Sequence, residues 1–466
     1  MWRKLILSIL FVLSVCGWSA GQTPELLLSG PMASATGQDS TIIWLQTTQP
    51  TTVSVKYRAV NQPDSVTSAT VCTTFDHLAQ VVLRNLTADT EYQYELTLNG
   101  QPYHLPYTCS FKTAPHSFDW KGFRFAAGSC AHVAGKAFDG ITPFARPKKL
   151  NHDLYHHITC HQPDFMLWLG DNVYLREDER EYLHAEGIRY RYKHARSLPD
   201  LQPFMGSSSH YAIWDDHDYG YDDSEHDFPL KDTSLKVFQQ YFPASTDTSV
   251  HFTGITGKMR WADVEFFMLD DRFYRNTQSN PSTMLGKAQI EWLKKQLKAS
   301  DAPFKALLIG SEIFNFTHLG ESVLVDFEKE IMDIFDFIVK EQITGVFVIS
   351  GDRHYAEVNN YRPKDGYPIY EYCVSSLTSM PGLFMTWKRN PTRVGKLAYD
   401  KRNFGIFDVT GQSFDDRKLC LTIHNLKGKP VWKHEVKLSD LQFKNQPVQP
   451  QDLKQAVREQ KPVNAE

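Results

Sequence analysis

The segment YAIWDDHDYG, residues 211–220, places four polar residues directly after a short apolar run. The run at 211–214 is typical of a buried strand, and it is followed by Asp215, Asp216, His217 and Asp218. Carboxylates at this spacing repel one another, and desolvation at a strand end makes their ionisation still less favourable. A positive charge is therefore expected beside this segment, and a metal ion is one way to supply it.

Five other apolar runs have the same form and also end in small or polar residues. They are FRFAAGSC (123–130), DFMLWLGDNVY (164–174), VEFFMLDDR (264–272), KALLIGSE (305–312) and GVFVISGDRHY (345–355). Segments with helical periodicity lie between most of them, most clearly at 283–300 and 322–342. Strands that alternate with helices are typical of α/β domains, and near-continuous apolar strands indicate sheets covered on both faces. We therefore predict an α/β catalytic domain over residues 122–445.

Residues 22–115 follow a different pattern, in which apolar and polar residues alternate. Examples are STIIWLQT (40–47), TVSVKYRA (52–59) and EYQYELTL (91–98). Such runs between turn signals predict an all-β sandwich of immunoglobulin or fibronectin type, with a spacer or packing role. The segment TAPHSFDWKG (113–122) is the predicted linker, and residues 446–466 are predicted to form a frayed tail.

Residues 1–21 have the pattern of an export signal. Arg3 and Lys4 precede the apolar run LILSILFVLSVC, and GWSAGQT then offers small residues for cleavage after Gly21. This pattern predicts a periplasmic or secreted protein. A lipoprotein anchor at Cys16 and an uncleaved membrane anchor are the alternatives. The apolar run is short for a membrane span, so no transmembrane segment is expected after cleavage.

The composition, with 22% charged and 41% hydrophobic residues, is that of a globular protein. A formal net charge of −4 argues against a nucleic-acid-binding surface, which needs concentrated Lys and Arg. A small phosphate ester bound through metals is compatible with this charge. Among seven scattered cysteines, Cys72 and Cys109 are the candidates for a disulfide within the N-terminal region.

The ends of the predicted strands carry residue types that bind metals. They include Ser129, Cys130, Asp171, Asn172, Tyr174, Asp216, His217, Asp352, Arg353 and His354. In open α/β sheets, sites form where strands end and loops begin. Carboxylates bridge cations, while imidazole, thiolate and phenolate groups fix their positions. Taken alone, an Asp-His pair is as well explained by a structural hydrogen bond, and Cys130 and Tyr174 are better explained by packing. The predicted multinuclear metal site therefore depends on GSC, LGDNVY, WDDHD and SGDRHY occurring together.

The order of these motifs resembles the PhoD family of secreted alkaline phosphatases, within the calcineurin-like metallophosphoesterases. GSC, LGDNVY, WDDHD, LDDRFYR and SGDRHYAE stand where that family has its conserved blocks. The resemblance extends over essentially the whole mature chain. It implies a four-layer αββα catalytic domain, phosphomonoesterase or phosphodiesterase activity, and Fe³⁺ with Ca²⁺ as the metals.

The resemblance also implies roles for individual residues. The implied metal ligands are Cys130, Asp171, Tyr174, Asp216, Asp352 and His354. His217 is implied as the histidine beside the scissile phosphate, and Arg272 as a basic catalytic residue near the site. Asp218 stands where many members have glutamate, and DYGYDD (218–223) replaces the usual asparagine. The calcium ligands or the substrate mouth are expected to differ there.

The predicted function is hydrolysis of a small-molecule phosphate mono- or diester by a metal-activated water. Cations neutralise the ester charge and lower the pKa of a bound water. Thiolate and phenolate ligands suit ferric iron, and oxygen ligands suit calcium. One alternative is a phospholipase-like phosphodiesterase, with GLFMTWKRNPTR (382–393) lining a wider mouth. The other is a non-catalytic binding protein with a degenerate site, although every expected ligand type is present.

Overall fold

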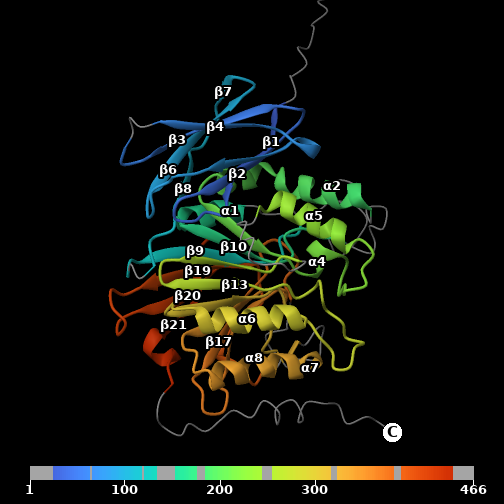
Figure 1. Cartoon of the computed structure of the whole chain (residues 1–466), viewed down its shortest axis with the longest axis vertical. Helices are drawn as coiled ribbons and strands as arrows, with labels where there is room; N and C mark the ends of the chain where they lie inside the picture. The colour runs from blue at the N-terminus through green and yellow to red at the C-terminus, as the bar shows by residue number, and fades with distance from the viewer. Residues whose placement is uncertain are drawn as a thin grey trace, which may run out of the picture.

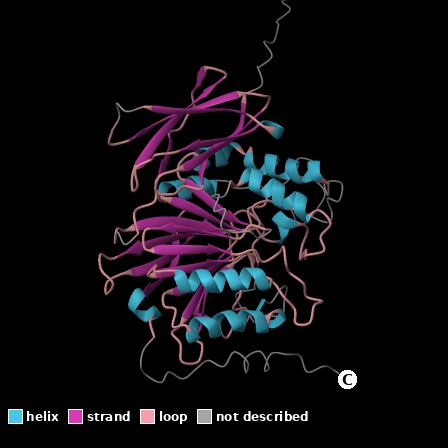
Figure 2. Cartoon of the chain, viewed as in Figure 1, coloured by secondary structure: helices cyan, strands magenta, loops and turns pink. Residues whose placement is uncertain are grey.

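Two β-sheets face each other across the middle of the molecule, and helices cover the outer face of each (Figure 1, Figure 2). This computed structural model describes residues 25–62, 66–117, 120–133, 153–175, 184–243, 254–315, 323–382 and 390–443. The predicted export signal, the tail at 446–466 and most of the segment 382–393 lie outside the described residues. The arrangement of layers is the predicted αββα sandwich.

One of the facing sheets has nine strands among the described residues. In spatial order they are β21 (Pro430–Lys437), β20 (Lys418–Asn425), β19 (Asn403–Thr410), β9 (Phe123–Gly128), β10 (Phe165–Leu169), β11 (Ser209–Ile213), β1 (Leu27–Ser34), β2 (Thr41–Thr47) and β5 (Leu78–Leu83). β9, β10 and β11 are parallel, so their carboxyl ends lie at one edge.

The other facing sheet has seven strands in the described part of the chain. Their order is β12 (Gly257–Trp261), β13 (Val264–Met268), β14 (Phe304–Leu308), β15 (Val346–Ser350), β17 (Ile369–Val374), β16 (Ala356–Tyr361) and β18 (Arg393–Tyr399). β13, β14 and β15 are parallel. Alternate residues of β10 show how the layers pack: Leu167 faces the core between the sheets, and Trp168 faces the helices outside.

The helices cover the outer faces. They are α1 (Asp153–Cys160), α2 (Ala185–Arg196), α3 (Gln202–Met205), α4 (Asp216–Tyr219), α5 (Lys231–Tyr241), α6 (Lys287–Ala299), α7 (Val323–Asp326) and α8 (Glu328–Lys340), with short 3-10 turns at Phe75–His77, Pro199–Leu201 and Leu438–Leu441. α1, α2 and α5 lie outside the nine-stranded sheet, and α6 and α8 lie outside the seven-stranded sheet (Figure 1). The longer helices α1, α2, α5, α6 and α8 bury their apolar residues against the neighbouring sheet.

The N-terminal region is all-β, as predicted, but one of its sheets is shared. β4 (Thr67–Cys72), β3 (Thr52–Ala59), β6 (Glu91–Leu98), β7 (Gln101–Tyr103) and β8 (Cys109–Lys112) form a separate sheet. This sheet packs against β1, β2 and β5 through a core that includes Ile43, Val55 and Tyr94. β1 also pairs in parallel with β11. One layer of the sandwich is therefore continuous with the catalytic sheet.

The two cysteines of the N-terminal region are not joined in a disulfide. Cys72 and Cys109 are both free thiols, which corrects the candidate disulfide. The strands β4 and β8 that carry them are separated by β3 and β6. Since neighbouring strands lie about 4.8 Å apart, β4 and β8 lie about 14 Å from each other across the sheet.

Within the described ranges, no helix has the length and apolar character needed to cross a membrane.

Candidate metal centre

Strand ends from both sheets meet at the candidate site. Cys130 follows β9, Asp171 follows β10, Asp216 begins α4 with two residues between it and the end of β11, and His354 follows β15. Cys130, Asp171 and His354 have positive φ angles of 58°, 53° and 56°. The left-handed region is uncommon for residues other than glycine, and such backbone clusters at functional sites. The chain turns sharply at these strand ends and presents side chains between the two sheets.

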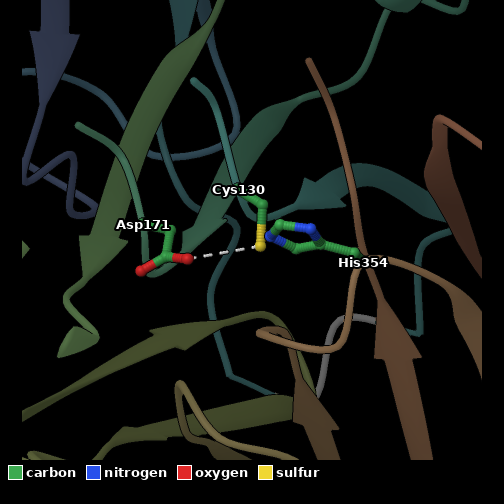
Figure 3. A group of neighbouring side chains, drawn as sticks. All are labelled: Cys130, Asp171 and His354. Carbon is green, nitrogen blue, oxygen red and sulfur yellow. Dashed lines mark hydrogen bonds between the residues drawn. The ribbon is translucent and has the colours of Figure 1, made fainter. Parts of the chain in front are cut away.

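The first candidate metal group consists of Cys130, Asp171 and His354, whose ligand atoms lie within 4.8 Å of one another (Figure 3). The Cys130 thiol donates to Asp171 Oδ2 at 3.5 Å. His354 Nε2 lies 3.1 Å from the Tyr174 hydroxyl, which adds a phenol to this group. Cys130 and Asp171 are buried. Sulfur, carboxylate, imidazole and phenol donors therefore converge from three loops.

The second candidate group consists of Asp171, Asp216 and His217. The main-chain N–H of His217 donates to Asp216 Oδ1 at 2.9 Å and lies 3.3 Å from Asp171 Oδ1. Asp171 belongs to both groups, with one oxygen toward Cys130 and the other toward His217. A carboxylate shared in this way is placed to bridge two cations.

Burial raises the proton affinity of three of these groups. It raises the pKa of the Cys130 thiol to about 12. Burial, and then repulsion by Asp216, raises the pKa of Asp171 well above its ordinary value. The pKa of the Tyr174 phenol is raised in the same way, by burial and then by Asp171. The Cys130 thiol and the Tyr174 phenol therefore keep their protons near neutral pH unless a cation takes the place of the proton, and all three groups bind a proton more tightly than in water.

Two other groups already have the ionisation state that a metal ligand needs. Burial acts to raise the pKa of Asp216, but His217, Arg272 and the main-chain N–H of Asp223 outweigh it and lower the pKa below its ordinary value. The Asp223 N–H donates to Asp216 Oδ2 at 2.9 Å. Burial lowers the pKa of His354. Asp216 is thus an anion and His354 a neutral imidazole at neutral pH.

The donor set fits metal ions, and unpartnered polar atoms beside it support this. Asn172 Oδ1 and Asp215 Oδ2 are buried and have no hydrogen-bond partner among the described residues. Buried polar atoms without partners are rare and call for an explanation such as an ion. A site with thiolate, imidazole and phenolate donors suits a transition metal, and a carboxylate-rich neighbour suits a hard divalent cation.

The structure brings six of the eight predicted site residues into the two groups, while Asp352 and Arg272 lie outside them, and the role of Asp352 as a metal ligand stays a prediction. Asp352 directs its main-chain oxygen toward the Cys130 thiol at 3.4 Å, while its carboxylate lies 3.6 Å from Arg353 Nη1. Arg272 is fully buried, and its Nε donates to Asp215 Oδ1 at 2.5 Å. This position does not fit direct contact with a substrate, and we propose that Arg272 positions the loop that precedes Asp216.

Asp218, singled out above only as a departure from the family pattern, has a structural role in the site. Its carboxylate accepts hydrogen bonds from the main-chain N–H of Asn172 at 3.1 Å and from that of Asp215 at 3.2 Å. The Tyr192 hydroxyl donates to it at 3.1 Å. These bonds join the loop of Asp171 to the loop of Asp216. The adjacent carboxylates in WDDHD were the available signal, but their directions cannot be read from sequence.

Ser375 and Ser379 also contact the site and were missed in the sequence. The Ser375 hydroxyl donates to Cys130 Sγ at 3.0 Å, and the Ser379 hydroxyl lies 3.2 Å from His354 Nε2. Both follow β17, whose end the pattern of apolar runs did not single out. Serines are too common in loops to be recognised as site residues without the fold.

Comparisons with known proteins identify a family and a shared fold. A model of the PhoD-like phosphatase family matches residues 125–409, and a model of a domain of unknown function, DUF7800, matches residues 24–115. The solved structure of PhoD is similar over 90% of this chain and 92% of its own, with 17% identity and a TM-score of 0.70. The purple acid phosphatase PPD1 from yellow lupin (Lupinus luteus) seeds is similar over 87% of this chain and 74% of its own, with 13% identity and a TM-score of 0.60. No curated protein sequence matches the chain. At these identities the structural similarities establish a shared fold.

Proposed function

Because the chain belongs to the PhoD-like phosphatase family, we propose that it hydrolyses phosphate mono- or diesters of small molecules at the site where its strand ends meet. The observation that carries this proposal is the sharing of Asp171 between two groups of ligand atoms. A phosphate ester resists nucleophilic attack because its own negative charge repels the nucleophile. Adjacent cations are the common solution to this problem.

We propose different metals for the two groups. Cys130, Asp171, Tyr174 and His354 would hold iron, because thiolate and phenolate donors suit Fe³⁺. Asp171 and Asp216 would hold a hard cation such as Ca²⁺, for which carboxylate oxygens are the usual ligands. When bound, the metals would neutralise the phosphate charge and lower the pKa of a water molecule.

His217 is the residue proposed to act on the substrate. Its side chain is 14% exposed, and Nε2 lies 3.4 Å from the exposed carboxylate of Asp222. The ring is held against the ring of Tyr174, with centroids 4.2 Å apart. A histidine that is fixed in place and reaches solvent is suited to stabilise or protonate a leaving alkoxide. Export is proposed from Arg3, Lys4 and the apolar run that follows.

Elemental analysis combined with turnover tests this function. Purified protein is assayed on nitrophenyl phosphate and on bis(nitrophenyl) phosphate, before and after removal of metals by a chelator. We expect stoichiometric metal, loss of both activities on its removal, and recovery when iron and calcium are returned. Protein dialysed in parallel without chelator is the control. Turnover that survives complete removal of metal would contradict the proposal, and the ratio of the two rates gives the ester preference.

A further inference from the structure

The surface of α1 carries two ligand-type side chains outside the candidate metal centre. Leu154, Tyr155 and Ile158 bury one face of this helix against the nine-stranded sheet. His156 and Cys160 lie on the other face and are exposed. Residues four apart on a helix are neighbours on its surface. The thiol and the imidazole therefore stand side by side and open to solvent.

The distance between the two side chains fits a single metal ion. Cys160 Sγ lies 3.6 Å from His156 Nε2. Tetrahedral zinc has Zn–S bonds of about 2.3 Å and Zn–N bonds of about 2.0–2.1 Å, which separates the two ligand atoms by about 3.6 Å. The pair therefore needs no rearrangement of the helix to chelate such an ion.

We propose that His156 and Cys160 form a surface site for a thiophilic transition-metal ion of the Zn²⁺ class. Binding replaces the proton of the Cys160 thiol with the metal, and this proton is released to solvent. Two of four tetrahedral positions are filled by the chain, and the other two are left for water or for a further ligand. A helix-borne thiolate with an imidazole is a soft donor pair, which favours zinc over calcium or magnesium.

This site is separate from the proposed phosphatase centre. α1 ends at Cys160, and β10 begins a few residues later at Phe165. Cys160 thus lies near the amino end of β10, whereas Asp171 follows its carboxyl end. Of the neighbouring histidines, His161 packs its ring against that of His424 at 4.3 Å between centroids, and the ring of His157 lies 5.7 Å from that of His156. The proposal is therefore independent of the function assigned above.

A titration with Co²⁺ tests the proposal, because zinc has no visible spectrum and cobalt in a thiolate site does. The metal-loaded enzyme is freed of excess metal and titrated while thiolate-to-cobalt absorption is recorded. We expect the parent protein to bind one additional equivalent of Co²⁺ per chain and to show this thiolate-to-cobalt absorption. Cys160→Ser should abolish it. His156→Gln should weaken binding at least about 10-fold, since even loss of an outer-shell partner costs about 10- to 100-fold in metal affinity.

Two variants serve as matched controls and should behave like the parent. Cys72→Ser removes another exposed free thiol. His157→Gln removes the adjacent histidine of α1, which packs close to Gly428. Phosphatase turnover of Cys160→Ser and His156→Gln should equal that of the parent, which confirms that both fold. The proposal is overturned if the thiolate absorption persists in Cys160→Ser, if it is absent from the parent, or if Cys160 yields only a disulfide-linked dimer without metal uptake.

Discussion

The Nδ1 atom of His217 lies 3.2 Å from the main-chain oxygen of Leu175. A carbonyl oxygen only accepts hydrogen bonds, so this contact assigns the Nδ1 proton in the neutral ring. Nε2 then faces the Asp222 carboxylate, 3.4 Å away. An imidazole with one nitrogen anchored and the other directed to solvent can give a proton to a leaving group without moving.

Replacing His217 by Asn should lower kcat by about two to four orders of magnitude, the usual worth of general acid help. Bound metal should be unchanged, because the amide of residue 217, which donates to Asp216, is retained. Alkyl phosphates should lose more rate than nitrophenyl phosphate, since poor leaving groups depend most on protonation. Steady-state kinetics on both esters, with elemental analysis, measures this. An equal loss on both esters would exclude the acid role, and loss of metal would make His217 a ligand.

Cys130→Ser should deplete iron selectively, because a hydroxyl is a much poorer anionic ligand than a thiol. The matched control is Cys373→Ser, since Cys373 is also fully buried and donates to main-chain oxygens at 3.2 and 3.6 Å. The control should keep its iron and lose only about 1 kcal/mol of stability. Iron content per chain and the unfolding midpoint are measured. Normal iron in Cys130→Ser would make this thiol a packing residue.

The loops after β10 and β11 are held in register by Asp218. Its carboxylate accepts from the main-chain amides of Asn172 and Asp215, which are the neighbours of the proposed ligands Asp171 and Asp216. Tyr192 connects the same carboxylate to α2. Partners behind the ligands of a metal site orient them and tune their affinity. Asp218 therefore acts by positioning, without contacting the substrate.

Asp218→Asn should weaken metal binding by about 10- to 100-fold. The Asn side chain has an NH₂ group where the carboxylate has an oxygen, so it cannot accept all the hydrogen bonds from the main-chain N–H groups of Asn172 and Asp215. Tyr192→Phe removes one donor and leaves both loop amides bonded, so its effect should be much smaller. Metal dissociation constants from chelator competition compare the two. After metal is restored at saturating concentration, Asp218→Asn should regain turnover. Unchanged metal affinity in Asp218→Asn would contradict the positioning role.

The strands that carry the site could be predicted from the sequence, but the directions of their side chains could not. Apolar runs followed by polar residues located the ends of β9, β10, β11 and β15. A strand that is buried on both faces needs a continuous run of apolar residues, and polar residues follow where the chain leaves the core. Directions depend on loop conformation and on partners distant in the chain. Arg272 is an example: the family resemblance implies a basic residue near the site, and only the structure shows that Arg272 is fully buried and bonded to Asp215.

The N-terminal region and the catalytic region share a sheet, which the sequence did not predict. Ala33 and Ser34 of β1 pair with Ser209 and His210 of β11. The Trp44 indole N–H donates to the main-chain oxygen of Gln240, close to the end of α5. Alternating apolar residues predict a sandwich, but they do not specify which strand lies next to which. The edge of β11 is therefore covered by chain from the other region.

A chain lacking residues 1–115 should fail to fold cooperatively. Its β11 would become an exposed edge strand, and edges of this kind promote association with other chains. Apolar residues of the outer face that pack on β1 and β2 would also be exposed. Thermal unfolding and size-exclusion chromatography of the truncated and full chains measure this. A soluble, cooperatively folding truncated chain with normal turnover would show that the N-terminal strands are dispensable.

The metal content of Asp171→Asn, measured together with its turnover of nitrophenyl phosphate, shows whether Asp171 bridges two cations. The amide has nearly the same shape but lacks the charge needed between two cations, so bound metal should fall and turnover should be abolished. The thermal midpoint should remain near that of the metal-free parent, because burial disfavours the charged carboxylate in the absence of metal. An Asp171→Asn variant that keeps the full metal content and normal turnover would show that Asp171 does not bridge two metal ions.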